Sequence, residues 1–332
     1  MFSISFSAEA NLNCQESRKE NSGNTVPMED TRLDVSFNVI SNSTVPTPSG
    51  SGAEEDSTQE LPVPKMIFKN QPAQNVDQSW SIAQLAQNFT PWSWEEVFAD
   101  AIPEIEHASR IITRFEEQGQ RFLPLKQDVF NAFKYTALFQ VKVVIVGQDP
   151  YPTELNIDGQ LVPRAMGLSF SVRKTDDIPP SLVNIYKEIE SCIPGWTAPD
   201  HGDLTAWATQ GVLLLNTIPT FRVPYYDATG KKIDDNARVF GPVWKPFIKK
   251  VLSSIYKVNP GCIFVLWGNP AQSLLNEKGF IADTCPVLKS PHPSPMSAYG
   301  KNGKPGFFGN RHFAQINELL IKQGKTPIDW TF

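Results

Sequence analysis

The chain has 332 residues, of which 40% are hydrophobic and 11% aromatic. A chain of this length and apolar content can bury a large core, which excludes global disorder, and no apolar run reaches the ~18 residues of a transmembrane helix. The formal net charge of −5 argues at face value against a polyanionic partner such as DNA.

The charge is, however, unevenly distributed along the chain. Residues 1–79 carry 5 Lys or Arg and 11 Asp or Glu, and residues 80–215 carry 10 and 17. Residues 216–332 carry 15 and 7, a net charge of +8. A basic segment interleaved with aromatic residues favours a nucleic-acid or membrane surface, although solvated helix faces give the same pattern.

Residues 1–78 are predicted to form a disordered, polar and acidic tail. Residues 41–64 are rich in Ser, Thr, Pro and Glu and offer little to bury. The apolar residues 66–68 are a candidate docking motif for unknown partners, although most such patches have no function. The N-terminus lacks the features of a secretory signal, and the four cysteines include no CxxC pair, so we expect reduced thiols in an intracellular protein.

Apolar runs of strand length begin in the predicted folded part, residues 79–332. They span residues 141–146, 211–215, 262–267 and, more weakly, 286–288. Continuous rather than alternating apolar runs are typical of parallel strands buried on both faces. Helical patterns at 181–192, 203–209, 242–256, 270–277 and 310–322 lie between and after them. This alternation predicts an α/β fold, a three-layer αβα domain around a central, mainly parallel four-stranded sheet.

Each predicted strand leads directly into a polar cluster. The clusters are GQDPY at 147–151, Asn216, Gly268-Asn269 and PHPSP at 291–295. Because ligands bind outside the carboxyl ends of the strands in open α/β sheets, we expect an acid, an amide, a histidine and an aromatic ring to meet at one edge of the sheet.

Three of these polar residues are candidates for chemistry. Asp149 precedes Pro150, which has no N–H to neutralise the carboxylate, so it could orient water or stabilise a cation; the alternative is an Asx turn. His292 lies in a rigid proline-rich segment where a neutral imidazole could donate to developing negative charge, although a lone histidine is usually structural. Asn216 could read a base edge or instead cap a helix.

Other residue types argue against a bound metal or nucleotide cofactor. His292 and His312 have no metal-ligand spacing to each other or to a cysteine. Neither a Walker loop nor a GxGxxG motif follows the first predicted strand. We therefore expect no metal and no cofactor. Tyr151 and Phe170, seen alone, are more often core residues than ligand stackers.

Several segments together resemble the family-1 uracil-DNA glycosylases. They are GQDPY (147–151), GLSFSV (167–172), HGDLTAWATQGVLLLN (201–216), VLWG (265–268), HPSPMS (292–297) and GFFGNRHFAQINELL (306–320). The resemblance runs from about residue 90 to the C-terminus and implies that residues 79–332 are a glycosylase domain of base-excision repair. Such a domain would flip deoxyuridine out of single- or double-stranded DNA, hydrolyse its N-glycosidic bond and leave an abasic site.

The resemblance also implies roles for individual residues. Asp149 would position the water and stabilise the sugar cation, and His292 would hydrogen-bond uracil O2 as the base leaves. Asn216 would read uracil N3–H and O4, Tyr151 would block the thymine methyl group, and Phe170 would stack on the base. The uracil-binding set is Gln148, Tyr151, Phe170 and Asn216. The DNA-binding set is Pro150, Ser181, Asn269, Pro293, Ser294, Pro295, Met296, Ser297, Lys301 and Lys304.

The chain departs from the family pattern near the proposed site. Met296 stands where the family has a wedging leucine, and its similar volume predicts that insertion into DNA survives. DNA-mimicking inhibitor proteins bind this family, and Met296 is expected to weaken their grip. The longer loop 300–305 leads to the hypothesis that Lys301 and Lys304 add phosphate contacts.

Further departures lie in two segments that are longer than usual. Residues 153–164 follow Pro152, which stands where many members have a histidine, and residues 220–238 lack an evident Ser-His pair of the family. With the tail, these insertions suggest a divergent eukaryotic or large-DNA-virus member, expected to be a monomer in the nucleus, or in the host nucleus if viral.

Two alternative functions compete with uracil excision. A DNA-bound scaffold or polymerase processivity partner with weak or no excision remains open, although intact Asp149, Asn216 and His292 favour chemistry. An iron–sulfur glycosylase is excluded by the number and spacing of the cysteines. The net charge does not oppose DNA binding, since DNA needs only one basic face and the basic excess lies beside the proposed site.

Overall fold

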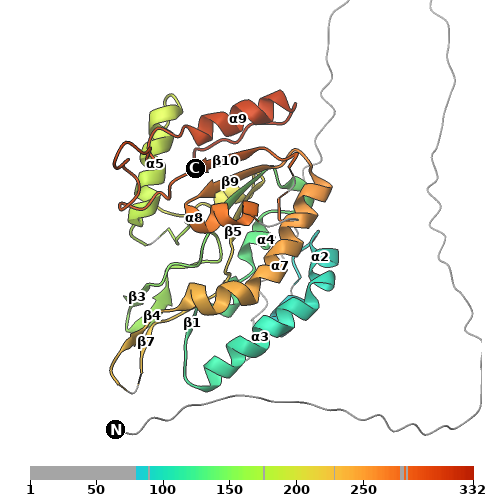
Figure 1. Ribbon diagram of the computed structural model, residues 1–332, viewed down its shortest axis with the longest axis vertical. Coiled ribbons are helices and arrows are strands. Elements are labelled where there is room, and N and C mark those ends of the chain that lie inside the picture. Colours follow the sequence, from blue (N-terminus) through green and yellow to red (C-terminus); the bar gives the residue numbers. More distant parts are fainter. Residues whose placement is uncertain (1–79, 89, 175, 228, 277–279, 282) are drawn as a thin grey trace, which may run out of the picture. The chain divides into compact units, whose positions relative to one another are not determined.

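The computed structural model describes residues 80–332 except 89, 175, 228, 277–279 and 282, so the predicted tail, its docking motif and the domain boundary at 79 lie outside the described residues. The central sheet has four parallel strands in the order β10–β9–β2–β5 (Figure 1). These strands are β2 (Val143–Gly147), β5 (Val212–Asn216), β9 (Ile263–Trp267) and β10 (Val287–Ser290). The predicted α/β fold and all four predicted strands are confirmed.

The burial of the strands explains the strength of their sequence signals. β2, β5 and β9 are buried along their whole length, as expected for strands covered on both faces. β10 lies at an edge of the sheet, and Val287, Leu288 and Lys289 are at least partly exposed. Its apolar run is therefore shorter and weaker than the other three.

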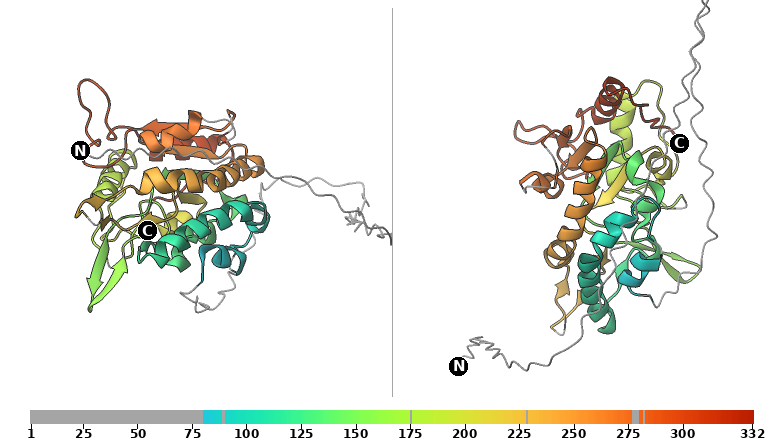
Figure 2. Two further views of the ribbon diagram at one scale, coloured as in Figure 1. Left: turned by 60° about the horizontal axis from the view of Figure 1, so that its bottom comes forward. Right: turned by 90° about the vertical axis from the view of Figure 1, so that its right-hand side faces the viewer.

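Helices on one side of the sheet come mainly from the N-terminal part of the described chain. They are α1 (Ile82–Asn88), α2 (Glu95–Asp100), α3 (Ile102–Glu117), α4 (Asn131–Tyr135) and α7 (Asn236–Val258). Helices α3 and α7 run side by side (Figures 1 and 2). The rings of Phe98, Phe130, Phe133 and Phe247 pack together with centroids 5.2–6.2 Å apart. These contacts hold α2, α4 and α7 in one aromatic core.

Helices α5 (Pro180–Cys192), α6 (Thr205–Ala208) and α9 (His312–Lys322) belong to the other side. Here the ring of Trp330 packs edge-on against Trp207 and Phe313, at 5.3 Å and 4.9 Å between centroids. The indole N–H groups of Trp196 and Trp207 donate to the Trp330 carbonyl at 2.8 Å and 3.1 Å. The sheet is thus sandwiched between two aromatic-rich layers.

Two predicted helices differ in extent from the observed ones. Helix α7 begins at Asn236 rather than Pro242, and both Pro242 and Pro246 lie inside it. Proline is tolerated best in the first turn, which is why the pattern predicted a later start. The predicted helix at 270–277 is divided into α8 (Asn269–Gln272) and a 3₁₀ turn (Ser273–Asn276). In the described part of the chain, no helix combines the length and apolarity needed to cross a membrane.

The two longer segments contain short antiparallel strands. Residues 153–164 form a hairpin of β3 (Glu154–Ile157) and β4 (Gln160–Pro163), which projects from the fold in Figure 2. In residues 220–238, β6 (Phe221–Arg222) pairs with β1 (Phe122–Leu123), and β7 (Tyr225–Tyr226) pairs with β8 (Lys232–Ile233). Both segments follow strand ends, at β2 and β5, on the side where the predicted site residues lie. The remaining 3₁₀ turns are Lys126–Asp128 and Leu138–Gln140.

Candidate active site

The parallel arrangement puts the predicted site residues at one edge of the sheet. Gly147 at the end of β2 pairs with Asn216 at the end of β5, and Ser290 at the end of β10 pairs with Trp267 at the end of β9. The segment after Gly147 and the loop after Ser290 therefore start at the same edge. This confirms that the predicted acid, amide and histidine arise at one side of the fold.

Asn216 is held by close packing against β2. It is the last residue of β5 and is buried, so the alternative of a helix cap does not apply. A Cβ added to Gly147 would lie 2.3 Å from Oδ1 of Asn216, closer than real contacts allow. The next residues are tied to β2, since the N–H of Thr217 donates to the Gly147 carbonyl at 3.0 Å and that of Ile218 to the Gln148 carbonyl at 2.9 Å. The side-chain amide therefore occupies one defined position.

The carboxylate of Asp149 is half-buried and has a side-chain partner from another element. Its Oδ2 accepts a hydrogen bond from Nδ2 of Asn236 at 3.2 Å. Burial raises the pKa of Asp149, hydrogen bonds from Asn236 and Gln148 counteract that rise, and the nearby charge of Asp234 adds to it. The contact is a long-range one, which distinguishes Asp149 from the simple Asx turn considered above.

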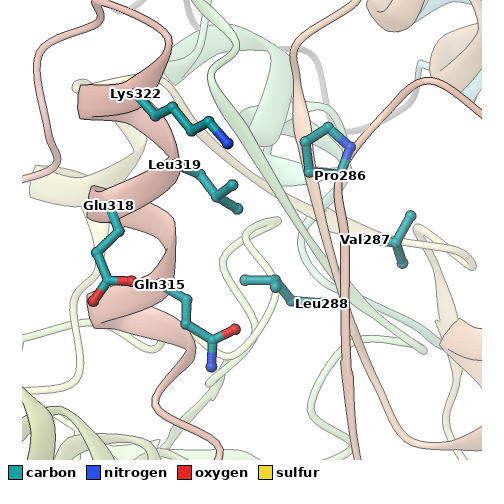
Figure 3. A pocket seen from close by; sticks show the side chains of 7 residues that line it. All are labelled: Pro286, Val287, Leu288, Gln315, Glu318, Leu319 and Lys322. Atoms are coloured by element: carbon teal, nitrogen blue, oxygen red, sulfur yellow. The ribbon is translucent and has the colours of Figure 1, made fainter.

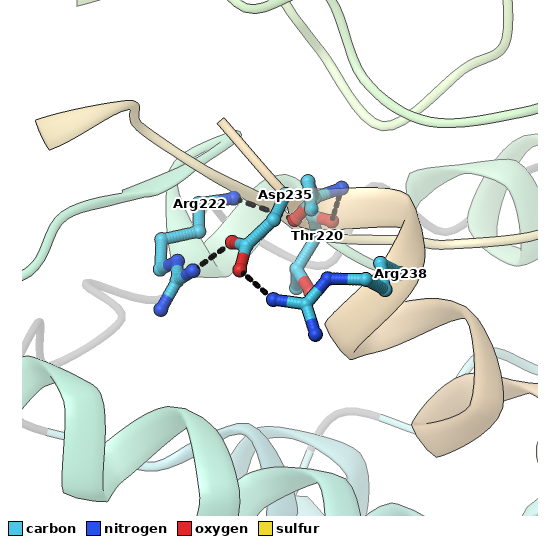
Figure 4. A network of polar contacts seen from close by, with 5 residues as sticks. Thr220, Arg222, Asp235 and Arg238 are labelled. Carbon is cyan, nitrogen blue, oxygen red and sulfur yellow. Dashed lines mark hydrogen bonds and ion pairs between the residues drawn. The ribbon is translucent and has the colours of Figure 1, made fainter. Parts of the chain in front are cut away.

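Asn236 is itself fixed by a polar network. Its Oδ1 accepts the backbone N–H of Arg222 at 2.9 Å, and its Nδ2 also reaches the Thr220 carbonyl at 3.3 Å. Next to it, the guanidinium groups of Arg222 and Arg238 approach the Asp235 carboxylate from two directions (Figure 4), with Arg238 at 2.6 Å. The network therefore orients the amide that meets Asp149.

Sequence reasoning missed Asn236. Segment 220–238 lacks an evident Ser-His pair of the family, and its helical pattern predicts a later helix start. The available signal was the Asp-Asn pair at 235–236 before an apolar helical pattern, which is typical of a helix start.

His292 is held as a hydrogen-bond donor. Its Nδ1 accepts the backbone N–H of Ser294 at 3.1 Å. Burial lowers the pKa of His292, which favours the neutral ring. A neutral imidazole whose Nδ1 accepts must carry its proton on Nε2. The Nε2–H is then the group available to a ligand.

Phe170 joins the histidine to the aromatic part of the site. Its ring lies 5.7 Å from that of His292 and 5.4 Å from that of Trp267, measured between centroids. The Tyr151 hydroxyl donates to the Phe170 carbonyl at 3.2 Å. Phe170 has a φ of 63°, a left-handed conformation that non-glycine residues keep only where their surroundings impose it. Tyr151, Phe170 and His292 thus form one connected group.

The loop after His292 carries most of the predicted DNA contacts. Ser297 Oγ donates to the His292 carbonyl at 2.7 Å and lies 3.0 Å from Ser294 Oγ. Met296 projects from this turn and is 82% exposed. Lys301 and Lys304 are exposed and close a further turn, in which the Lys304 N–H donates to the Lys301 carbonyl at 3.0 Å. The loop therefore presents two hydroxyls, an apolar side chain and two cations to solvent.

The other predicted contacts lie at element starts or in the loops themselves. Ser181 is the second residue of α5 and is half-buried, while Asn269 begins α8 directly after β9 and is exposed. Pro150 and Pro293 are buried, and Pro295 is exposed. The two buried prolines shape the loops, and the exposed residues remain free to contact DNA.

Two cavities are lined by other residues. One, of about 410 Å³, lies between α9 and β10 and is lined mainly by aliphatic parts of Leu288, Leu319 and their neighbours (Figure 3). The other, of about 460 Å³, is lined by Ile112, Leu123 and residues around them. Neither lining includes Asp149 or His292. Within the described residues, no three His, Cys, Asp or Glu side chains gather as metal ligands would, and Cys192, Cys262 and Cys285 form no disulfide bond there.

Comparison with known proteins identifies relatives of this fold and site. The family model described as "Uracil DNA glycosylase superfamily" matches residues 133–321. A Klebsiella pneumoniae protein named uracil-DNA glycosylase is 45% identical over 246 residues, covering 73% of this chain and 95% of its own length. An Escherichia coli protein of the same name is 43% identical over 242 residues, covering 72% of this chain and 94% of its own.

Solved structures give the same result. The crystal structure of mimivirus uracil-DNA glycosylase is 30% identical, with a TM-score of 0.62 over 72% of this chain and 86% of its own. A variant of mimivirus UNG in complex with UGI matches with a TM-score of 0.62 and 30% identity, over 73% of this chain and 88% of its own. The two bacterial sequences are thus more similar to this chain than the mimivirus protein is, and the likeness does not single out a viral source.

Proposed function

This chain belongs to the uracil-DNA glycosylase superfamily, and from that premise we propose how it excises uracil and from which DNA. As a member of that family it is a hydrolase of DNA repair. The proposed reaction is hydrolysis of the N-glycosidic bond of deoxyuridine in single- and double-stranded DNA. Uracil is flipped into the site before cleavage, and the products are free uracil and an abasic site.

The observation that carries this proposal is the placement of a carboxylate and a neutral imidazole at one edge of the sheet. Breaking the N1–C1′ bond leaves positive charge on the sugar and negative charge on uracil. Asp149 supplies negative charge for the sugar and a hydrogen-bond acceptor for the attacking water. His292 donates its Nε2–H to uracil O2, where the charge of the leaving base develops.

The protonation states of Asp149 and His292 suit these two roles. The pKa of Asp149 is raised by burial and held back by the hydrogen bonds from Asn236 and Gln148, which favour the ionised form. The pKa of His292 is lowered by burial, so its neutral form extends to lower pH than for a free histidine. Preorganised donors of this kind cost no reorganisation during the reaction.

Selection of uracil rests on the buried amide and two rings. The side-chain amide of Asn216 offers one donor and one acceptor, which match uracil O4 and N3–H. Phe170 stacks on the base, and Tyr151 stands where a 5-methyl group would clash. The backbone near Gln148 adds a contact to O2. A rigid wall rejects thymine better than a pocket that merely lacks a favourable contact.

Contacts to the DNA strand come from the loops around this edge. Ser181, Ser294 and Ser297 hold phosphates, Met296 fills the gap that the flipped nucleotide leaves, and Lys301 and Lys304 add charge. Asn269 and Pro295 complete the surface, and the buried Pro150 and Pro293 shape the loops beneath it.

The test measures abasic sites. The protein is incubated with uracil-containing single- and double-stranded oligonucleotides in a chelator, followed by alkaline cleavage, with Asp149→Asn alongside. Cleavage at uracil by the native protein and a large loss in the variant support the proposal. Tight DNA binding without cleavage would instead support a scaffold or a polymerase processivity partner.

Inhibitor binding offers a second test of the DNA-binding surface. A mimivirus relative is described in complex with UGI. We propose that a DNA-mimicking inhibitor of this kind also binds the loop after His292 in this protein. Because methionine stands at 296 where the family has leucine, we expect the inhibitor to bind the native protein less tightly than the Met296→Leu variant. Equal affinities would refute the contribution of this side chain.

Oligomeric state and location are further proposals. One chain contains every residue in the proposed chemistry, which supports a monomer, and sedimentation at several concentrations tests it. Genomic DNA as substrate supports a nuclear location, which fluorescence of the tagged full chain tests.

A further inference from the structure

Helix α5 carries two buried polar side chains one turn apart that the proposed chemistry does not use. Asn184 is 7% exposed and Glu188 is 1% exposed. Nδ2 of Asn184 donates to the Pro293 carbonyl at 2.8 Å. Pro293 directly follows His292, so this bond fixes the start of the loop that bears Met296.

Glu188 fixes the other end of the same loop. Its Oε2 accepts the N–H of Gly309 at 2.7 Å, and its Oε1 accepts the N–H of Arg311 at 2.8 Å. Gly309 and Arg311 both have left-handed backbones, with φ of 85° and 55°. Backbone N–H groups that point to one carboxylate in such a turn, just before a helix N-terminus, form a site for an anion. Arg311, at the N-cap of helix α9, makes no side-chain cap bond. Oδ1 of Asn310 accepts the N–H of His312 at 2.8 Å, and Glu188 accepts the N–H groups on either side of Asn310.

The residues between these two anchors are also tied together at their base. The N–H of Phe307 donates to the Ser297 carbonyl at 3.3 Å, and that of Phe308 donates to the Ala298 carbonyl at 3.1 Å. Phe307 and Ala298 are fully buried, whereas Met296 is exposed. The exposed turn that bears Met296 is therefore attached to a buried segment, and helix α5 holds both ends of that segment.

We propose that Asn184 and Glu188 are positioning residues, which set loop 293–309 so that Met296 is presented to duplex DNA at the moment of base extrusion. The inference rests on the proposed function. A uracil in a single strand is already unpaired and needs less help to leave its neighbours, whereas a uracil in a duplex must be separated from its partner. Loosening the loop should therefore affect the duplex substrate selectively.

The test uses Glu188→Gln, which keeps the size of the side chain. A glutamine has one oxygen and an NH₂ group, so it can accept only one of the two N–H groups and leaves the other facing an NH₂ group that cannot accept it. The control is Glu190→Gln, the same change on the exposed face of the same helix. We measure kcat/KM on one uracil sequence as a duplex and as a single strand, together with amide exchange at Gly309 and Arg311.

For Glu188→Gln, we expect kcat/KM to fall about tenfold on the duplex and less than about twofold on the single strand, with faster amide exchange. The control should match the native protein. In a Met296→Ala background, the duplex-to-single-strand ratio should not fall further, since both changes act through one element. If Glu188→Gln does not fold, Asn184→Asp is used, which replaces the donor to Pro293 by an acceptor.

Equal losses on both substrates, or a further loss in the Met296→Ala background, would overturn the positioning role. A native protein that excises uracil from neither substrate would overturn the proposed function instead. The two failures are thereby distinguished.

Discussion

Strand pairing places the residues at the ends of β2 and β5 at the catalytic edge of the sheet. The residues after β10 are instead held there by hydrogen bonds from a helix that is far away in the sequence. Asn216 is placed opposite Gly147 by the register of the sheet. Met296 lies in loop 293–309, which directly follows His292 and whose two ends are held by Asn184 and Glu188 of α5. The first arrangement is part of the sheet core, and the second can change without disturbing it.

This difference matters for how the two regions tolerate change. In the paired region, a small shift of one strand pushes the buried amide of Asn216 against the neighbouring strand. A single substitution there should therefore cause a large loss of activity. In loop 293–309, Met296 is exposed, and substitutions there should alter how DNA is bound, whereas His292, which precedes this loop, takes part in the cleavage itself. The following experiments test this contrast, from the largest expected effect to the smallest.

Replacing Asp149 by Asn should have the largest effect. The exchange keeps the shape but removes the negative charge that faces the sugar cation, and we expect kcat to fall by about 10³-fold. Single-turnover cleavage of a uracil oligonucleotide measures it. Because chemistry is common to both substrates, the loss should be the same for single and double strands; a selective loss on duplex DNA would break the contrast between the two regions.

Replacing Gly147 by Ala tests placement through the strands. The added Cβ would lie 2.3 Å from Asn216 Oδ1 and 2.8 Å from Ser169 Cβ, so the amide must move. A displacement of this kind costs roughly 10²-fold in kcat/KM. Gly241→Ala in α7 is the control, since its nearest neighbour is 3.7 Å away and should accept the methyl group. Equal activity of the two variants would show that the register does not determine the site.

Removing the Asn236 side chain tests the partner of Asp149. Asn236→Ala deletes a hydrogen bond to a charged group, and we expect kcat to fall about tenfold. That bond lowers the pKa of Asp149, so its loss raises the pKa further, and the acidic limb of the kcat profile should move to higher pH. The charge of Asp234 raises the same pKa, so Asp234→Asn should move the limb to lower pH. Shifts in the same direction would contradict the assignment of this limb to Asp149.

The smallest effect is expected from Lys301 and Lys304. Replacing both by Ala should leave kcat unchanged and reduce the slope of log Kd against log salt by up to about 1.8, if each contacts one phosphate. Lys257 and Lys322 are the controls, because the chain just after α7 and α9 contacts the segments before β2 and β9, through Asn259 to the Val141 carbonyl and Gln323 to the Gly261 carbonyl. An unchanged slope for the first pair would remove these lysines from the DNA contact surface.

The same contrast explains what the sequence could predict. Asn216 directly follows a continuous apolar run and Asp149 lies three positions after another, and parallel pairing then brings them to one edge, so local patterns suffice. Asn236 meets Asp149 across 87 positions of sequence, and Glu188 meets Gly309 across 121. Such contacts depend on how α5 and α7 pack on the sheet, which no local pattern encodes. Helix α3 was not predicted, although its buried residues Ile105, Ala108 and Ile112 recur at helical spacing.

The tight fit of Gly147 against Asn216 also limits how the base preference of this protein can be engineered. The amide is buried, and the backbone opposite it has no side chain that could be trimmed to make space. A larger residue at 216 would have to push two paired strands apart. A redesign of the recognised base therefore has to exchange donors and acceptors at constant volume, or begin with the aromatic residues Tyr151 and Phe170 instead.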